Sequence, residues 1–94
     1  EGAAELPLSG TRDGGIIHAV IDRTFVADGV RWVVDYKLSS PAPGERMEDF
    51  LVREGEHYRP QLDTYIRLMG AYDTRHPVQG AFYFPLVDGW FEAP

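Results

Sequence analysis

Asp28 and Gly29 separate two runs that are rich in β-branched and aromatic residues, and this dipeptide constrains the fold more than any other part of the chain. An Asp-Gly pair supplies the positive φ angles that a two-residue β-hairpin turn requires. The runs on either side, residues 16–27 and 30–38, are therefore predicted to form two antiparallel strands. A turn of known length also fixes which residues face one another.

The predicted turn places two carboxylates opposite each other. If Ala27 faces Val30, the residue numbers of every cross-strand pair add up to 57, so that Asp22 faces Asp35. A four-residue loop around the same dipeptide gives the same pairing, whereas a three-residue loop with a bulge would shift it. Opposed Cβ atoms lie about 4.5–5.5 Å apart, where like charges repel each other. A divalent cation bound by both carboxylates would compensate that repulsion.

Lys37 adds a positive charge to this pair. It follows Asp35 by two residues on one strand, so both side chains point to the same face. Hydrolysis of a phosphodiester needs a cation that polarises the phosphoryl oxygen and a positive group that stabilises the developing charge. The Asp-Xaa-Lys spacing also occurs often by chance, and a surface ion pair on a strand explains these residues equally well when they are taken alone.

The opposite face of the hairpin is predicted to be the core face, covered by a helix, which leaves the carboxylates on the side that a substrate can approach. Its members are Ile17, Ala19, Ile21, Phe25, Trp32, Val34, Tyr36 and Leu38.

The rest of the chain predicts three further elements of structure. Residues 4–11 read as a first strand at the sheet edge, where Pro7 needs no ladder partner, and residues 12–15 as a turn. After a loop at residues 39–44, residues 45–53 form a short helix that ends before Gly55, and residues 56–72 form a second helix with Pro60 in its first turn. Residues 78–86 form a fourth strand, followed by a turn at residues 88–89.

The fold class expected from these elements is α+β (α/β), with an antiparallel three-strand meander followed by a helix and a further strand. The whole of residues 1–94 fits a single folded domain, since 44% of the residues are hydrophobic and 13% aromatic. The absence of cysteine excludes disulfides, zinc fingers and a cysteine-bound iron–sulfur cluster.

Charge and hydropathy bear on location and partners. No charged and apolar leader begins the chain, and no apolar stretch is long enough to cross a membrane, so a cytoplasmic protein without a membrane partner is expected. The net charge of −6 predicts weak DNA binding by this domain alone, because Lys and Arg supply most of the affinity for phosphates.

Three segments, residues 19–23, 32–37 and 58–65, together resemble the nuclease domain at the C-terminus of UvrD/Rep-type helicase–nucleases, a branch of the PD-(D/E)XK nuclease superfamily. The nearest resemblance is to the RecB and AddA subunits of exonuclease V, and the segments follow the family's order and spacing across roughly residues 5–86. The resemblance implies a restriction-endonuclease-like core that lacks the family's N-terminal helix. It also implies that residues 1–94 are a C-terminal fragment of a larger helicase–nuclease.

The activity that this resemblance implies is Mg²⁺-dependent hydrolysis of DNA in double-strand break repair, with Mn²⁺ able to replace Mg²⁺. By position, Asp22 and Asp35 would bind the metal with the backbone carbonyl of Tyr36, and Lys37 would position water and stabilise the transition state. Gln61 and Tyr65 match the family's Gln-Xaa-Xaa-Xaa-Tyr motif and would support the site or contact DNA. A purely structural role for Tyr65, as a core aromatic, is equally open.

Two features depart from the family. The family has a further metal ligand, usually histidine, on a helix upstream of the first aspartate, and nothing before Glu1 carries one here. His18 does not replace that ligand, because it lies about 13 Å from Asp22 along an extended strand. The isolated fragment is therefore expected to have an incomplete catalytic set. Related branches use cysteines for an iron–sulfur cluster, which this chain cannot form.

The partners implied by the resemblance are single-stranded DNA, a helicase domain in the same protein and, as a further option, a partner subunit. Two other functions remain open from the residues. One is a catalytically inactive nuclease-like module that guides DNA or docks a subunit. The other is an acidic binding domain in which the matching segments arise by chance.

Overall fold

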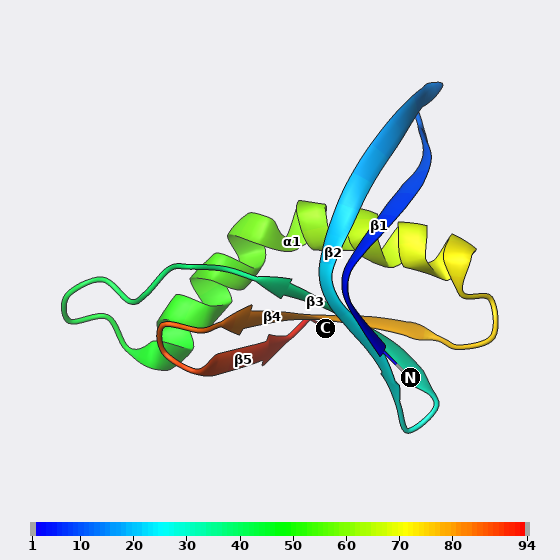
Figure 1. Ribbon diagram of the computed structural model, residues 1–94. Helices are drawn as coiled ribbons and strands as arrows, with labels where there is room; N and C mark the ends of the chain where they lie inside the picture. Colours follow the sequence, from blue (N-terminus) through cyan, green and yellow to red (C-terminus); the bar gives the residue numbers. More distant parts are fainter. Residues whose placement is uncertain (1, 94) are drawn as a thin grey trace.

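The computed structural model describes residues 2–93, which form a five-stranded mixed sheet and one long helix, an α+β arrangement (Figure 1). The strands follow one another across the sheet in chain order, β1-β2-β3-β4-β5. The elements are β1 (Gly2–Arg12), β2 (Gly15–Ala27), β3 (Val30–Tyr36), α1 (Met47–Tyr72), β4 (Val78–Phe84) and β5 (Gly89–Glu92).

Strands β1 to β3 form the predicted antiparallel meander, with the predicted register. Asp28 and Gly29 have φ angles of 51° and 77°, as the two-residue turn requires. Ala27 pairs with Val30. The ladder continues in the same register to the pair of Arg23 and Val34. The proline-containing first strand lies at the sheet edge, as predicted.

Strand β4 confirms the fourth predicted strand and lies parallel to β3. Parallel neighbours need a long crossover connection, which α1 provides between residues 37 and 77. Strand β5 was not predicted. It pairs antiparallel with β4 after a turn in which Asp88 has a φ angle of 49°.

The prediction of two helices was wrong, because α1 runs without a break from Met47 to Tyr72. A break was expected at Gly55, yet this residue is buried where the helix lies against Phe91 of β5. A Cβ atom there would lie 2.6 Å from Cε2 of Phe91. Pro60 lies inside the helix instead of in its first turn, and the Thr64 hydroxyl donates to the Pro60 carbonyl at 3.2 Å. Burial of residues such as Leu62 and Met69 outweighs the local helix-breaking tendency.

The helix covers the predicted face only along the first part of β2, where Ile17, Ala19 and Ile21 pack with the core, whereas along β3 it covers the face opposite to the one predicted. Val33 and Phe82 are fully buried beneath α1, and Asp35 pairs with Phe82 across β3 and β4 and lies on the same face. By contrast, Tyr36 is 43% exposed and Leu38, which lies beyond the end of β3, is 78% exposed. The carboxylate cluster therefore lies at the interface between sheet and helix, and not on a face remote from the helix.

A bend in the β1–β2 pair explains why simple alternation misplaced the core. Glu5 has a φ angle of 57°, and the ladder skips its pairing with Asp22. Before this point β2 turns Ile21 inward, and beyond it β2 turns Thr24 inward, so the buried parity changes within three residues. The two ends of the curved β1–β2 pair point in different directions, and one end crosses α1 (Figure 1).

A buried ion pair joins the start of β3 to the end of α1. Arg31 Nε donates to Asp73 Oδ2 at 2.8 Å, and both side chains are nearly inaccessible. His76 Nδ1 lies 2.9 Å from the same oxygen, and the backbone N–H of Arg75 donates to Asp73 Oδ1. The Arg31 guanidinium, followed by these other donors, holds the pKa of Asp73 well below its ordinary value.

Replacing Asp73 with alanine is expected to lower the free energy of unfolding by about 2–3 kcal/mol, because it removes the buried carboxylate that accepts hydrogen bonds from the Arg31 guanidinium and the Arg75 N–H. Urea denaturation at neutral pH measures this change. Asp63→Ala is the matched control, since Asp63 pairs with Arg59 on the exposed helix surface and should contribute only about 0.5 kcal/mol. Equal effects of the two substitutions would contradict a structural role for the buried pair.

Candidate metal centre

The predicted site residues come together between the meander and α1. Lys37, directly after β3, donates from Nζ to Gln61 Oε1 at 2.7 Å. The same ammonium lies 3.2 Å from Asp35 Oδ2 and 4.0 Å from the ring centroid of Tyr58. The Lys37 ammonium is thus held by a carboxylate from β3 and by an amide oxygen and an aromatic face from α1.

Asp22 is fixed by the backbone of the facing strand. Its Oδ2 accepts a hydrogen bond of 2.9 Å from the Tyr36 N–H. Asp22 is half-buried at the bend of β2, and its carboxyl group lies within hydrogen-bonding reach of the Asp35 carboxyl group. The register derived from the hairpin turn therefore brings the two acids together, as predicted.

Asp35 is the more buried of the two acids. Its exposed fraction is 4%, and burial, followed by the hydrogen bond with Asp22, raises the pKa of Asp35 to about 6 even though Lys37 opposes the shift. Within residues 2–93, Asp35 Oδ2 accepts no aligned hydrogen bond, although Lys37 Nζ is nearby. A buried carboxylate oxygen normally accepts at least one hydrogen bond, so Asp35 Oδ2 is incompletely coordinated.

Tyr65 lies beside the acid pair. Partial burial, and then the negative charges of Asp35 and Asp22, raise the pKa of the Tyr65 hydroxyl, which keeps it protonated. Tyr65 also packs against the hydrophobic core. Both roles considered for Tyr65 therefore agree with its position, whereas Gln61 is exposed and contacts Lys37 directly.

The donor set is small and consists of oxygen atoms. No group of three or more His, Cys, Asp or Glu side chains that could hold a metal occurs in the described part of the chain. Two adjacent carboxylates, one with a buried and incompletely coordinated oxygen, nevertheless fit Mg²⁺. This ion is commonly bound by one or two carboxylates, with water and substrate phosphate completing its octahedron.

Tyr58 is a site residue that the sequence interpretation missed. It precedes Gln61 by three residues and Tyr65 by seven, so all three occupy one helix flank. From the sequence, Tyr58 was placed only within the helix predicted over residues 56–72 and within the segment of residues 58–65. Two features of the sequence could have identified Tyr58. It lies three residues from Gln61 on the predicted helix, and the chain has only one lysine, Lys37, for a site of this kind to use.

A second cluster anchors the segment that follows Lys37. Ser39 Oγ donates to Oε1 of the buried Glu54 at 2.5 Å. Arg53 binds Glu54 Oε2 at 2.9 Å and both carboxylate oxygens of Glu45. The loop between β3 and α1 is therefore tied to the helix at both of its ends, which restricts the main chain next to Lys37.

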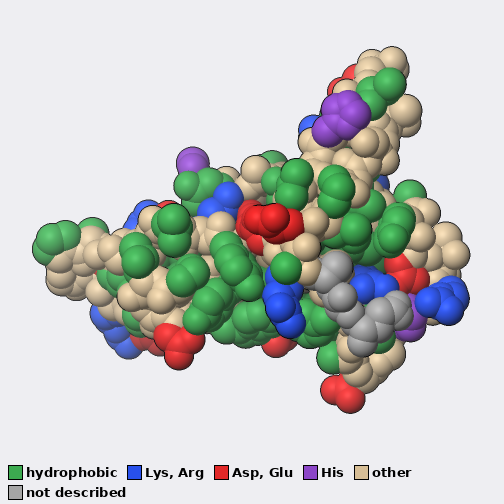
Figure 2. Space-filling view, viewed as in Figure 1, with side chains coloured by type: hydrophobic (Ala, Val, Ile, Leu, Met, Phe, Trp, Pro, Cys, Tyr) green, Lys and Arg blue, Asp and Glu red, His purple; other side chains and the backbone are tan. Residues whose placement is uncertain are grey.

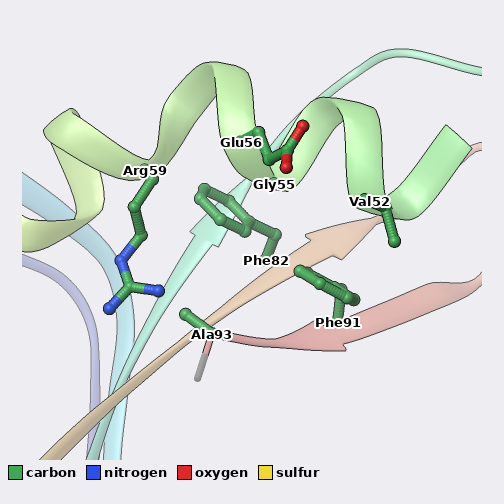
Figure 3. A pocket seen from close by; sticks show the side chains of 7 residues that line it. All are labelled: Val52, Gly55, Glu56, Arg59, Phe82, Phe91 and Ala93. Carbon is green, nitrogen blue, oxygen red and sulfur yellow. The ribbon is translucent and has the colours of Figure 1, made fainter.

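A well-defined hollow lies away from the acid pair. It measures about 380 Å³ and opens between α1 and strands β4 and β5, where Figure 3 shows Phe82 and Phe91 facing the helix. Its wall is mainly apolar, and its one acid and one base, Glu56 and Arg59, both come from α1. It lacks adjacent carboxylates, so it does not compete with the centre at Asp22 and Asp35.

No helix among residues 2–93 has the length and apolarity needed to cross a membrane. No protein-family model matches the chain, and no curated protein matches it closely enough to be counted as a relative.

Proposed function

We propose that the chain is a metal-dependent deoxyribonuclease module with a restriction-endonuclease-like core of the PD-(D/E)XK type. The observation that carries this proposal is the adjacency of the Asp22 and Asp35 carboxyl groups, with a buried oxygen short of hydrogen bonds and the Lys37 ammonium 3.2 Å away. Two acids that raise each other's energy, next to a fixed cation, are arranged to bind a divalent ion.

Each residue has a distinct part in the proposed reaction. Bound Mg²⁺ would lower the pKa of a coordinated water and polarise the phosphoryl oxygen. Asp22 and Asp35 would hold the ion, and the Tyr36 N–H fixes the orientation of Asp22. Lys37 neutralises the charge that develops on the phosphate as the bond to the leaving oxygen breaks.

Gln61 and Tyr58 determine where the Lys37 ammonium lies. The Gln61 amide oxygen accepts a hydrogen bond from Nζ, and the Tyr58 ring borders the same group. Holding a lysine side chain in one position costs conformational entropy. In the folded protein this entropy is already lost before the substrate binds. Contacts with the helix thus fix the position of the Lys37 ammonium relative to the phosphate.

Calorimetric titration with Mn²⁺ tests the metal centre. Wild-type protein is expected to bind the ion, and Asp22→Asn should weaken binding by at least about tenfold, since loss of even an outer-shell partner typically costs 10–100-fold. The asparagine keeps an oxygen that can accept the Tyr36 N–H. Asp63→Asn, on the exposed helix surface, is the matched control and should bind as the wild type does. Binding that does not depend on Asp22 would refute the proposed centre.

A second candidate is a nuclease-like module without activity that docks a protein or guides DNA. The sheet face turned away from α1 favours it, because hydrophobic side chains gather over the strands there (Figure 2). Trp32 and Trp90 have ring centroids 6.0 Å apart, and Tyr36 and Tyr83 lie 5.7 Å apart. DNA cleavage that is lost when Lys37 is replaced would exclude this candidate.

The wider setting is part of the same proposal. The electrostatic field of a domain with a net charge of −6 adds little to its affinity for DNA. Delivery of single-stranded DNA by a helicase domain in the same protein would therefore suit its chemistry. A cytoplasmic role in double-strand break repair, with a partner subunit as a further option, follows from the family resemblance alone.

A further inference from the structure

A groove of about 340 Å³ lies between the outer end of the β1–β2 hairpin and the middle of α1. Arg12 and His18 line it from the hairpin, and four residues line it from the helix. The helix residues are Pro60, Gln61, Thr64 and Tyr65. Figure 1 shows the hairpin crossing the helix and projecting beyond it, which gives the groove its two walls.

The hairpin and the helix, which form the two walls of the groove, are in direct contact beside it. Gly10 of β1 lies against Leu68, so that a Cβ atom at Gly10 would be 2.3 Å from the nearest leucine methyl group. Arg67 Nη1 donates to the Thr11 carbonyl at 3.2 Å. The hairpin is therefore fixed to α1 beside the groove, and the groove is a built feature of the interface.

The charge of this groove is opposite to the charge of the protein. None of the residues that line it within residues 2–93 is acidic, while Arg12 brings a permanent positive charge and His18 an imidazole. His18 Nδ1 lies 2.7 Å from Ser9 Oγ, which orients the ring and leaves Nε2 for an outside ligand. In a chain with a net charge of −6, a local excess of positive groups favours an anion.

The groove leads directly to the candidate metal centre. Gln61 lines it and accepts a hydrogen bond from Lys37, and Tyr65 lines it while lying within the electrostatic reach of both acids. His18 and Asp22 lie four residues apart on β2, a separation of about 13 Å. An anion at His18 could therefore belong to the same polymer as a phosphate at Asp22.

We propose that this groove holds the single-stranded DNA that leads to the acid pair, with Arg12 and His18 bound to its phosphates. The bound phosphates lie roughly two to four nucleotides from the scissile bond, because a stacked strand advances by about 3.4 Å per nucleotide and an unstacked strand by more. Tyr65 and Pro60 supply apolar surface for the sugars and bases. The identity of the strand as substrate rests on the proposed nuclease function.

Fluorescence anisotropy with a labelled short oligothymidylate tests the groove. The titration is made in EDTA over a series of salt concentrations, so that neither metal binding nor cleavage enters the result. Arg12→Gln is expected to weaken binding at low salt by about three- to tenfold and to reduce the slope of log affinity against log salt by about 0.7, which corresponds to one phosphate contact. His18→Gln should weaken binding in the same direction.

Two variants serve as controls. Arg12→Lys keeps the charge and should keep the wild-type salt slope. Arg46→Gln removes one positive charge at the start of α1, where Arg46 forms an exposed ion pair with Glu48, and should leave oligonucleotide binding unchanged. Arg12 and His18 are both exposed, so their substitution does not disturb the core.

The groove and the nuclease function fail in different ways. No binding of the oligothymidylate by the wild type, or equal salt slopes for Arg12→Gln and Arg46→Gln, would overturn the groove even if Mn²⁺ still bound at Asp22. Conversely, Asp22-independent Mn²⁺ binding together with a reduced slope for Arg12→Gln would refute the metal centre and leave the groove as a nucleic-acid site.

Discussion

Lys37→Ala is expected to lower the rate constant for cleavage of single-stranded DNA by about 10²- to 10³-fold, the usual effect of removing one group that stabilises transition-state charge. Lys37 is the only lysine in the chain. Its ammonium is positioned by Asp35 and Gln61, and the substitution removes the charge without removing either carboxylate. Single-turnover cleavage of a labelled strand with Mn²⁺ measures the effect. The assay uses the 94-residue chain and, where the gene extends upstream, the longer protein as well.

Lys37→Arg separates charge from placement. The guanidinium keeps the positive charge but is planar and larger, and it does not fit the contacts with the Gln61 oxygen and the Tyr58 ring in the same way. An intermediate rate is therefore expected. Mn²⁺ affinity should change little in Lys37→Ala, because the ligands remain. Cleavage by Lys37→Ala at the wild-type rate would show that the ammonium has no catalytic role and would contradict this prediction.

The register of the meander was predictable because it depends on local turn chemistry. Asp28 and Gly29 adopt positive φ angles for reasons that reside in those two residues, and the pairing of Ala27 with Val30 follows from the turn length. The proximity of Asp22 and Asp35 is a direct consequence. This half of the candidate site could be located by counting residues from the turn.

The position of the helix was not predictable by the same means. Strict alternation of side chains fails at Asp22, because the positive φ angle of Glu5 on the neighbouring strand accompanies a bend that exchanges the inward and outward faces. Glutamate seldom adopts such a backbone conformation, so the local sequence does not predict the bend. The helix consequently lies over Asp35 and Lys37, and its Tyr58 enters the site.

Continuity of α1 is likewise a tertiary effect. Gly55 and Pro60 each disfavour the interior of a helix, by roughly 1 and 3 kcal/mol in an exposed setting. Both are tolerated here because residues on either side, such as Phe50 and Leu62, bury their side chains against the sheet. Propensity rules describe the helix in isolation and omit this contribution.

The acid pair also has a consequence for stability. Burial and the neighbouring carboxyl group raise the pKa of Asp35 to about 6 in the folded protein, above the ordinary value of 3.8. Between these two values the folded state holds a proton that the unfolded state has released. The free energy of unfolding of the metal-free protein is therefore expected to rise as the pH falls from 7 to 5, and to be lowest where Asp35 is charged.

Asp35→Asn is expected to make the metal-free protein more stable at pH 8 while abolishing metal binding. A shift of one pKa unit corresponds to about 1.4 kcal/mol, and partial solvent access to the pair reduces the full effect, so a gain of about 1–2 kcal/mol is expected. For a domain of this size that gain raises the Tm by about 5–10 °C. The variant should also lose the stabilisation on acidification between pH 7 and 5, because the group responsible for it is gone.

Thermal denaturation with and without Mn²⁺ distinguishes a metal centre from a merely strained acid pair. Wild-type protein should gain stability with increasing Mn²⁺, as expected for a ligand that binds only the folded state, whereas Asp35→Asn should show no such gain. If Mn²⁺ stabilised neither protein, the repulsion between Asp22 and Asp35 would serve no metal, and the nuclease proposal would fail. If Asp35→Asn were less stable than the wild type at pH 8 without metal, the burial of a disfavoured charge at this position would be refuted. Higher stability together with lost metal binding is expected for a residue whose charge is unfavourable for folding but is needed to bind a ligand.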